Sequence, residues 1–175
     1  MKIFLTGNPG IGKTTIIKKV IERIERKVIG FYTTEIRKEG KRIGFEIVEI
    51  PSNTKHLFAS TEKISNIRFG KYYLDLEPLE EIIKKIEDKE SEADIIIIDE
   101  IGKMEFFSKK FRNFIKKLLN SNKTLLATLH RSYKKEFGRY GEVIEVTKEN
   151  RDFLPEKILE MLTRGSMQDE KVSKA

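Results

Sequence analysis

The feature that most constrains this chain is a glycine-rich segment between a short apolar run and an amphipathic stretch. Lys2–Thr6 (KIFLT) has the composition of a short buried strand, and Gly7–Gly12 follows it directly. Lys13–Arg26 then places apolar side chains along one helical stripe and charged side chains along the other. A strand, a glycine-rich turn and a helix in this order predict the opening unit of an α/β domain.

The glycine-rich segment also fits a specific phosphate-binding pattern. Gly7–Thr14 reads GNPGIGKT, which matches the spacing G-x-x-x-x-G-K-[ST]. Glycines let the backbone curl closely around a polyphosphate, and the helix that follows directs its N-terminal dipole at the anion. In this arrangement Lys13 reaches the β- and γ-phosphates, and the Thr14 hydroxyl is placed to ligate Mg²⁺. The segment therefore predicts a phosphate-binding loop, or P-loop.

A second signal is an unbroken apolar run that ends in two acids. Ile95–Ile98 predicts a strand buried on both faces, and Asp99 and Glu100 follow it. Asp99 would lie at the sheet edge where the P-loop opens, so it can hold Mg²⁺ through a water. Glu100 can orient and polarise a water for in-line attack on a γ-phosphate. We expect Lys13 and Glu100 to be catalytic and Thr14 and Asp99 to be metal ligands.

A softer signal follows the next apolar run, Thr124–Leu129. We expect this strand to lie between Lys2–Thr6 and the Asp99 strand, as it does in P-loop folds with an additional strand. A polar residue at its tip would then face the γ-phosphate, and Thr128 and His130 are the candidates. A solvated loop histidine is the alternative interpretation of His130.

Phosphoryl transfer also needs a cation near the developing negative charge. The basic segment 130–141 (HRSYKKEFGRYG) is punctuated by glycine, which is typical of a mobile flap. For any single arginine, and for Lys103 and Glu105 beyond the acidic pair, an ordinary surface position is the alternative. The candidate cations are Arg37, Arg42, Arg131, Arg139 and Arg151.

The remaining pattern alternates strands and helices, which predicts an α/β domain with a mainly parallel sheet. A turn at Glu39-Gly40-Lys41 joins two strands as an antiparallel hairpin. We expect the domain to span 1–164 and the polar tail 165–175 to be disordered. Beyond the first helix, strands are predicted at Val28–Ile36, Arg42–Ile50, His56–Ala59, Tyr72–Leu76, Asp94–Asp99, Thr124–Leu129 and Val143–Val146, and helices at Pro78–Lys89, Ser108–Leu119 and Asp152–Leu162.

Composition excludes several classes of protein. The chain has 175 residues, enough for one domain, and charged residues make up 36% of it, which argues against a membrane-spanning protein. It contains no cysteine, so disulfides, thiolate zinc sites and a cysteine nucleophile are excluded. The net charge of +7 could indicate a nucleic-acid partner, but acidic residues are interleaved with the basic ones, as on heat-adapted surfaces. Without a recognisable signal peptide, we expect a cytoplasmic protein.

With both motifs placed, the chain resembles the small nucleoside-triphosphatases of thermophiles, which have a vertebrate relative described as a cancer-related nucleoside-triphosphatase. The resemblance implies a RecA-like P-loop core and Mg²⁺-dependent hydrolysis of ATP, GTP and other triphosphates, CTP and UTP or TTP among them. The matching stretches are GNPGIGKTT at 7–15, GFYTTEIRKEGKRIGFEIV at 30–48, GKYYLDL at 70–76, IIIIDEIGKMEFFS at 95–108 and VTKENR at 146–151.

The resemblance also implies a set of nucleotide-binding residues, because no motif position departs from the family pattern. It is drawn from the P-loop and from the strand that carries the acidic pair. These positions are Gly7, Asn8, Pro9, Gly10, Ile11, Gly12, Lys13, Thr14, Thr15, Ile95, Ile96, Ile97, Ile98, Asp99, Glu100, Ile101 and Gly102.

Two other functions stay open. A nucleotide or nucleoside kinase would need a second substrate pocket and a lid that keeps water out, and segment 130–141 is the only lid candidate. A nucleic-acid-binding module switched by a nucleotide would use the excess positive charge and would bind in a salt-sensitive way. The Asp-Glu pair favours hydrolysis, since kinases with this fold often lack the second acid.

Overall fold

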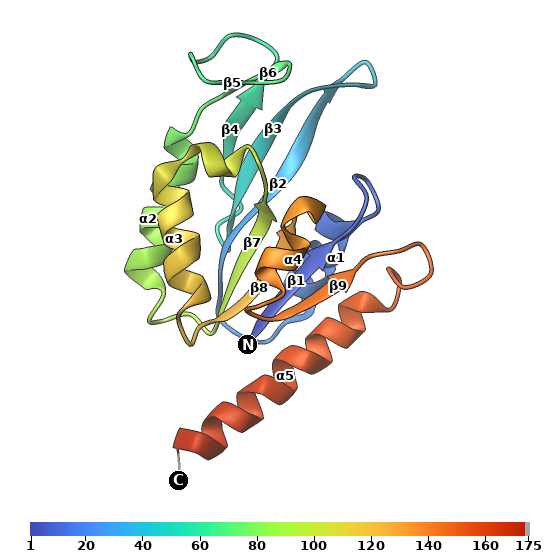
Figure 1. Ribbon diagram of the computed structural model, residues 1–175, viewed down its shortest axis with the longest axis vertical. Helices are drawn as coiled ribbons and strands as arrows, with labels where there is room; N and C mark the ends of the chain where they lie inside the picture. Colours follow the sequence, from blue (N-terminus) through green and yellow to red (C-terminus); the bar gives the residue numbers. More distant parts are fainter. Residues whose placement is uncertain (174–175) are drawn as a thin grey trace.

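A mixed sheet runs through the molecule, with helices on both of its faces (Figure 1). The computed structural model describes the backbone of residues 1–173 and the side chains of residues 1–168 and 171. Within this part the sheet has nine strands in the order β5-β6-β4-β3-β2-β7-β8-β1-β9. The strands are β1 (Lys2–Thr6), β2 (Val28–Lys38), β3 (Lys41–Ile50), β4 (Lys55–Ser60), β5 (Arg68–Phe69), β6 (Tyr72–Leu74), β7 (Ile95–Ile101), β8 (Thr124–Leu129) and β9 (Glu142–Glu145).

The helices divide between the two faces of the sheet. One apolar core joins α2, α3 and α4 to the sheet, and the other joins α1 and α5 to the opposite face. Ile96 and Ile98 of β7 face the first core, and Ile95 and Ile97 face the second, which is why this strand reads as continuously apolar. The helices are α1 (Lys13–Arg23), α2 (Glu77–Lys89), α3 (Lys109–Leu119), α4 (Lys134–Phe137) and α5 (Leu154–Ser173), with short 3₁₀ turns at Glu105–Phe107 and Arg131–Tyr133.

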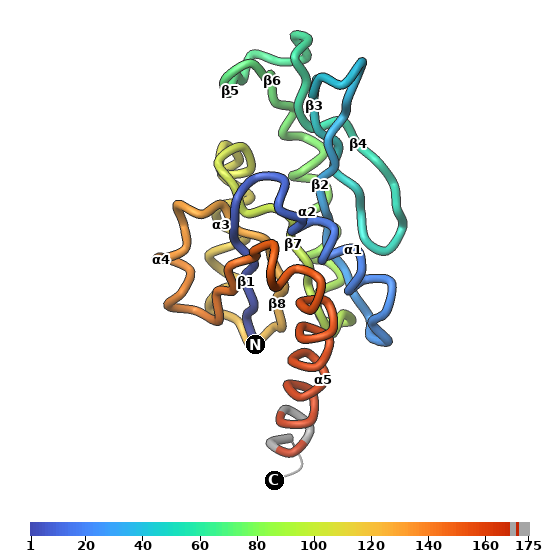
Figure 2. The backbone as a smooth tube through the Cα atoms, turned by 90° about the vertical axis from the view of Figure 1, so that its right-hand side faces the viewer, coloured from blue at the N-terminus to red at the C-terminus, as the bar shows by residue number. Residues whose placement is uncertain are grey.

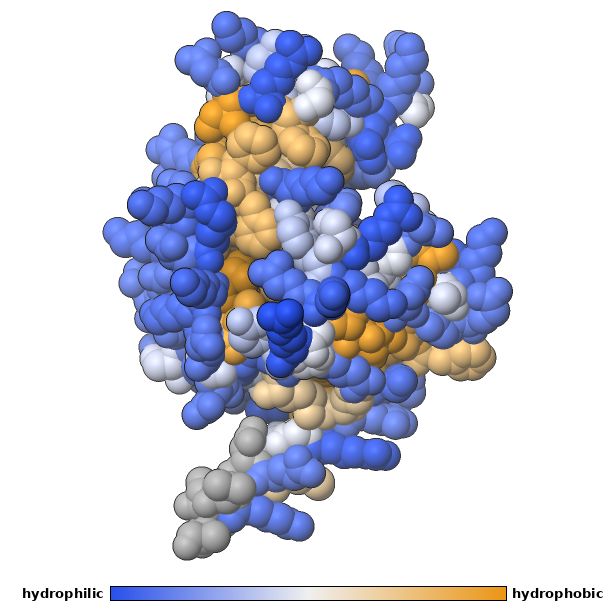
Figure 3. Space-filling model, viewed as in Figure 1, coloured by the Kyte–Doolittle hydropathy of each residue, from blue (hydrophilic) through white to orange (hydrophobic). Residues whose placement is uncertain are grey.

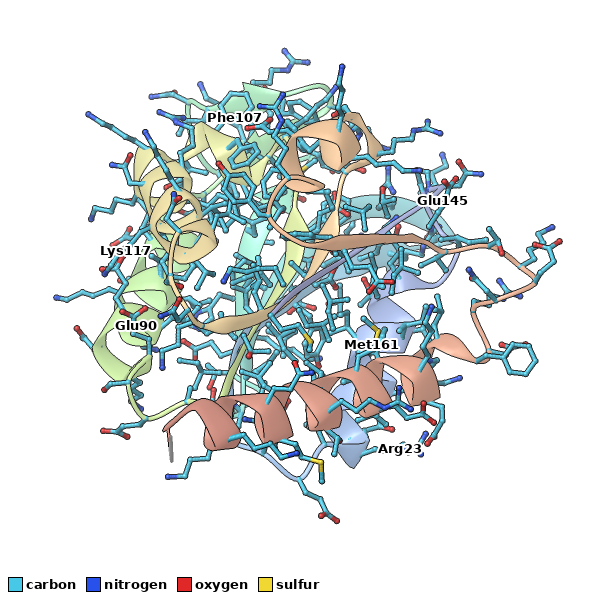
Figure 4. All side chains as sticks on the ribbon, turned by 60° about the horizontal axis from the view of Figure 1, so that its bottom comes forward. Arg23, Glu90, Phe107, Lys117, Glu145 and Met161 are labelled. Carbon is cyan, nitrogen blue, oxygen red and sulfur yellow. The ribbon has the colours of Figure 1, made fainter. Side chains whose placement is uncertain are left out.

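Helix contacts with neighbouring elements follow the expected pattern. The Ser108 hydroxyl accepts a hydrogen bond from the Phe111 backbone N–H, so it caps α3 as the sequence predicts. Glu90, just after α2, and Lys117 of α3 form an ion pair at 3.7 Å, and Figure 4 labels both side chains. On the other face, α5 lies against α1, and Met161 packs on the core between this pair and the sheet (Figure 4).

The parallel half of the sheet confirms the predicted strand order. β8 lies between β1 and β7 and is parallel to both, with Ala127 opposite Phe4 on one side and Ile98 on the other. β9 pairs with the far edge of β1, also in parallel. The carboxyl ends of these strands therefore meet at one edge of the sheet, where the P-loop leaves β1.

The other half is an antiparallel extension that rises beyond the helices (Figures 1 and 2). β2 begins parallel to β7 and then continues as a long hairpin with β3, and β4, β6 and β5 follow outward. Gly30 makes the junction possible, because its φ is +147° and a Cβ there would lie 1.8 Å from the Ile97 carbonyl oxygen. Only glycine allows β2 to approach β7 this closely.

The carboxyl-terminal segment differs from the sequence-based expectation. The prediction ended the last helix at Leu162 and left 165–175 disordered, but α5 continues without a break to Ser173. Residues 174–175 lie outside the described residues. The helix continues because its first turns are docked on the core and no proline follows Gly165, so the later residues extend an existing helix at little cost.

Candidate active site

A cleft of about 530 Å³ opens at the carboxyl edge of the parallel strands. The P-loop and the start of α1 form one wall, the β2–β3 hairpin forms the opposite wall, and Asp99 and Glu100 of β7 lie at its base. In Figure 3 the outline of the molecule is notched between the sheet extension and the lower body. The cleft thus brings together the two motifs that the sequence singled out.

The P-loop has the backbone shape that anion binding requires. Gly7, Gly10 and Gly12 have φ values of +147°, +76° and +116°, which side-chain-bearing residues rarely adopt. A Cβ on Gly7 would also lie 2.8 Å from the Val146 carbonyl oxygen. The Lys13 ammonium lies over the loop and donates hydrogen bonds to the carbonyl oxygens of Gly7 and Asn8, at 3.1 and 3.4 Å. The loop therefore presents backbone amides, a helix N-terminus and one ammonium to the same space.

Asp99 is buried and tied to both neighbouring motifs. Its carboxylate accepts a hydrogen bond of 2.7 Å from the Thr14 hydroxyl and a second one from the Thr128 hydroxyl. Burial raises the pKa of Asp99 to about 6, although these two hydrogen bonds act in the opposite direction. Thr128 is fully buried and faces Asp99, so it orients this carboxylate instead of facing a phosphate. Of the two candidates at the tip of β8, only His130 lines the cleft.

The carboxyl groups of Glu100 and Glu105 both lie close to Gly102. A Cβ on Gly102 would lie 2.7 Å from a carboxylate oxygen of Glu100 and 2.8 Å from one of Glu105, so a side chain there would displace both. Burial raises the pKa of Glu100, and the Lys13 ammonium partly opposes the rise. Burial and the nearby Glu100 raise the pKa of Glu105 to about 8. The interpretation of Glu105 as a surface residue is therefore wrong, because Glu105 is only 6% exposed.

His130 follows β8 and carries a defined hydrogen bond. Its Nδ1 accepts from the Ser132 backbone N–H at 3.2 Å, which leaves Nε2 as the protonated nitrogen of the neutral ring. Burial and the nearby cations Lys103, Arg131 and Lys13 lower the pKa of His130. A neutral imidazole with an Nε2–H donor is suited to contact an anion in the cleft.

The candidate arginines separate into three groups. Arg37, Arg42 and Arg131 line the cleft, and Arg131 donates a hydrogen bond of 3.0 Å to the Asn8 side-chain oxygen of the P-loop. Arg151 donates to the Ile11 carbonyl oxygen at 3.3 Å, which braces the loop from beside β9. Arg139 lines a separate hollow between α4 and β9.

The structure also adds residues that sequence reasoning missed. Thr33, Thr34 and Phe45 of the hairpin line the cleft opposite the P-loop, together with Lys18 of α1. Arg42 is held in place between them: its Nε donates to the Tyr72 hydroxyl at 2.8 Å, and its Nη1 donates to Glu35 at 3.1 Å. No local spacing marks these residues. The only signal for the hairpin residues was that 30–48 belongs to the stretches that carry the family resemblance, and Lys18 had none.

Among the described residues, every helix is too short or too polar to cross a bilayer.

The chain is similar to known proteins over nearly its whole length. The sequence profile of a family described as NTPase matches residues 2–159. A nucleoside-triphosphatase THEP1 from Methanocaldococcus jannaschii is 43% identical over 169 residues, covering 94% of this chain and 99% of that protein. A nucleoside-triphosphatase THEP1 from Thermotoga maritima is 42% identical over 176 residues, covering 96% of this chain and all of that protein.

Solved structures agree with the sequence comparison. The crystal structure of THEP1 from Aquifex aeolicus superposes with a TM-score of 0.80 at 39% identity, covering 93% of this chain and 99% of that one. The solution structure of a human cancer-related nucleoside triphosphatase gives a TM-score of 0.74 at 31% identity, covering 92% of this chain and 96% of that one. The P-loop, the acidic pair and these matches lead to one conclusion: the chain belongs to the NTPase family.

Proposed function

We propose that this protein is a Mg²⁺-dependent nucleoside-triphosphatase that hydrolyses ATP, GTP, CTP and UTP or TTP to the diphosphate and phosphate. The observation that carries the proposal is the contact between Thr14 and Asp99 beneath the P-loop, with Glu100 beside it in the same cleft. The names of the relatives specify no single base, which supports a broad range of nucleotides. The cytoplasmic location stays a prediction from the sequence.

The residues around Asp99 fit a magnesium ion. Thr14 and Asp99 offer a hydroxyl and a carboxylate oxygen, the hard donors that Mg²⁺ prefers, and these two oxygens are already 2.7 Å apart. Within the described residues there is no cluster of three acidic or imidazole side chains that could enclose an ion. That suits Mg²⁺, which commonly takes one or two protein oxygens and completes its shell with water and substrate phosphates. When bound, Mg²⁺ would neutralise charge on the β- and γ-phosphate oxygens.

The chain's own groups supply the remaining chemistry. The loop amides and the Lys13 ammonium hold the phosphates and offset the charge that develops on the leaving oxygen. Glu100 orients the attacking water and accepts its proton. Thr128 fixes the Asp99 carboxylate from below, and the His130 Nε2–H donates to a γ-phosphate oxygen. Arg131 both lines the cleft and donates a hydrogen bond to Asn8 of the loop, so it is the arginine best placed to offset charge on the phosphates.

The test is a product analysis in ¹⁸O-labelled water with each of the four ribonucleoside triphosphates. We expect one ¹⁸O atom in each released phosphate, loss of turnover with EDTA and recovery with added Mg²⁺. Turnover that is unaffected by EDTA would reject the metal assignment. Turnover with only one triphosphate would reject the broad specificity.

A further inference from the structure

A second pocket continues from the cleft beyond Glu100. It encloses about 190 Å³ and shares four lining residues with the nucleotide cleft, namely Thr33, Phe45, Glu100 and His130. These shared walls include the residue proposed to activate water and the imidazole proposed to contact the γ-phosphate. A molecule in this pocket would therefore lie next to the position from which the γ-phosphate is attacked.

The walls that the second pocket does not share are mostly apolar. Phe58 and Phe69 come from the sheet extension, and Met104 comes from the segment after β7. Figure 3 shows an apolar band on this face, between the sheet extension and the lower body. Phenylalanine rings and a methionine thioether favour a flat aromatic group over a strongly hydrated one. Hydrolysis by itself needs no such surface.

Two carboxyl groups in the lining limit the charge of the occupant. Glu105 and Glu100 both line the pocket, and both lie against Gly102. A phosphorylated acceptor would bring its negative charge toward the Glu100 carboxylate and against the Glu105 carboxyl group, with the exposed Lys103 as the one lysine or arginine in the lining. A neutral ligand avoids this conflict and can donate or accept hydrogen bonds with Glu105. The volume suits one ring, or two fused rings, and is too small for a nucleotide.

We propose that this second pocket binds an uncharged aromatic alcohol and that the protein transfers the γ-phosphoryl group to its hydroxyl. The proposal rests on the assignment of the first cleft as the nucleoside-triphosphate site. The acceptor oxygen forms a bond to the γ-phosphorus, and the bond between this phosphorus and the β–γ bridging oxygen breaks. The hydroxyl proton passes to the Glu100 carboxylate, and the diphosphate leaves with the bridging electron pair. The products are an aryl-alkyl phosphate and a nucleoside diphosphate.

The experiment uses the full chain with benzyl alcohol, 2-phenylethanol and 3-(hydroxymethyl)pyridine as probes. Binding is measured by saturation-transfer NMR, and phosphomonoester formation from ATP is measured by ³¹P NMR. We expect binding of at least one probe and a new phosphomonoester signal in its presence. If none of the three alcohols binds, or if phosphate is transferred to water alone with all of them, the proposal is overturned.

A pocket-filling variant and its matched control assign the effect to this pocket. Met104→Trp should weaken probe binding and phosphomonoester formation about tenfold, while acceptor-free hydrolysis of ATP stays unchanged. The control is Phe107→Ala, because Phe107 is 43% exposed and packs edge-on against Phe69 without lining the pocket. Transfer that persists in Met104→Trp would also overturn the proposal. If the unmodified protein does not hydrolyse ATP, the proposed function is rejected. The NMR binding measurement would still report on the pocket in that case.

Discussion

The parallel half of the sheet and its antiparallel extension contribute to one cleft in different ways. β1, β7 and β8 are buried along most of their length and end in the P-loop, the acidic pair and His130. The hairpin of β2 and β3 is half-exposed and contributes Thr33 and Phe45 from the middle of long strands and Arg42 from the start of β3. Reactive groups thus gather where parallel strands end together, whereas the opposite wall depends on how far a hairpin reaches.

This difference indicates a division of roles. Strand ends in the buried half are fixed by packing on both faces, which holds catalytic groups within the narrow tolerance that chemistry needs. In the proposed function, the extension would contact the nucleotide without contacting the reacting bond. Changes in the parallel half should therefore alter the rate of the chemical step, and changes in the extension should alter binding.

The largest effect is expected in the parallel half at Lys13. Lys13→Ala removes the ammonium over the P-loop, so turnover should fall by about a thousandfold and nucleotide affinity should fall with it. Isothermal titration and phosphate-release assays measure the two effects. Unchanged affinity and rate would remove the P-loop from the mechanism and would show that the parallel half does not set the rate of the chemical step.

The next effect separates chemistry from binding at the end of β7. Glu100→Gln keeps the size of the side chain but removes its charge, so kcat should fall by about a hundredfold or more while Mg·ATP still binds. Asp99→Asn weakens a metal ligand instead, and raising Mg²⁺ should partly restore its activity. Near-normal turnover of Glu100→Gln would mean that another group positions the water.

A smaller effect concerns the stability of the protein and comes from Glu105, in the turn after β7. The pKa of Glu105 is raised to about 8, so the folded state binds more protons than the unfolded state between roughly pH 4.5 and 8. Its contribution to the free energy of unfolding therefore declines as pH rises through this window. The unfolding free energy of Glu105→Gln minus that of the unmodified protein should therefore increase by more than about 1 kcal/mol from pH 5 to pH 9.

Guanidinium denaturation at both pH values gives this difference. Lys110→Gln is a suitable control, since it changes an exposed charge in an ion pair with Glu80, away from Gly102. Parallel pH profiles for Glu105→Gln and the unmodified protein would mean that Glu105 is ionised in the folded state.

The smallest effect is expected in the extension at Arg42. This guanidinium joins Tyr72 and Glu35 across the hairpin wall, so Arg42→Ala should raise KM about fivefold with little change in kcat. Arg68→Ala is the control, because Arg68 lies on β5 outside both pockets. A fall in kcat with constant KM would show that the extension takes part in the chemical step and not only in binding.

The elements and motifs that depend on local pattern could be predicted from the sequence. Glycine spacing and the following amphipathic run predict the P-loop, and the apolar run before Asp99 predicts a buried strand. The place of the Thr124–Leu129 strand between the other two was also predicted correctly, because the acidic pair is typical of that strand order. These features are encoded within a few residues of one another, so a single sequence reveals them.

Which distant residues meet depends instead on how the elements pack in three dimensions. Thr128 contacts Asp99 and Glu105 is buried beside Glu100 because β7, β8 and the turn after β7 pack together, and no spacing in the chain states this. The wall formed by Phe45 and the second pocket formed with Phe58 and Phe69 depend on the curvature and reach of the extension. Local sequence fixes backbone geometry over a few residues, whereas burial and pocket shape are sums over contacts made far apart in the chain.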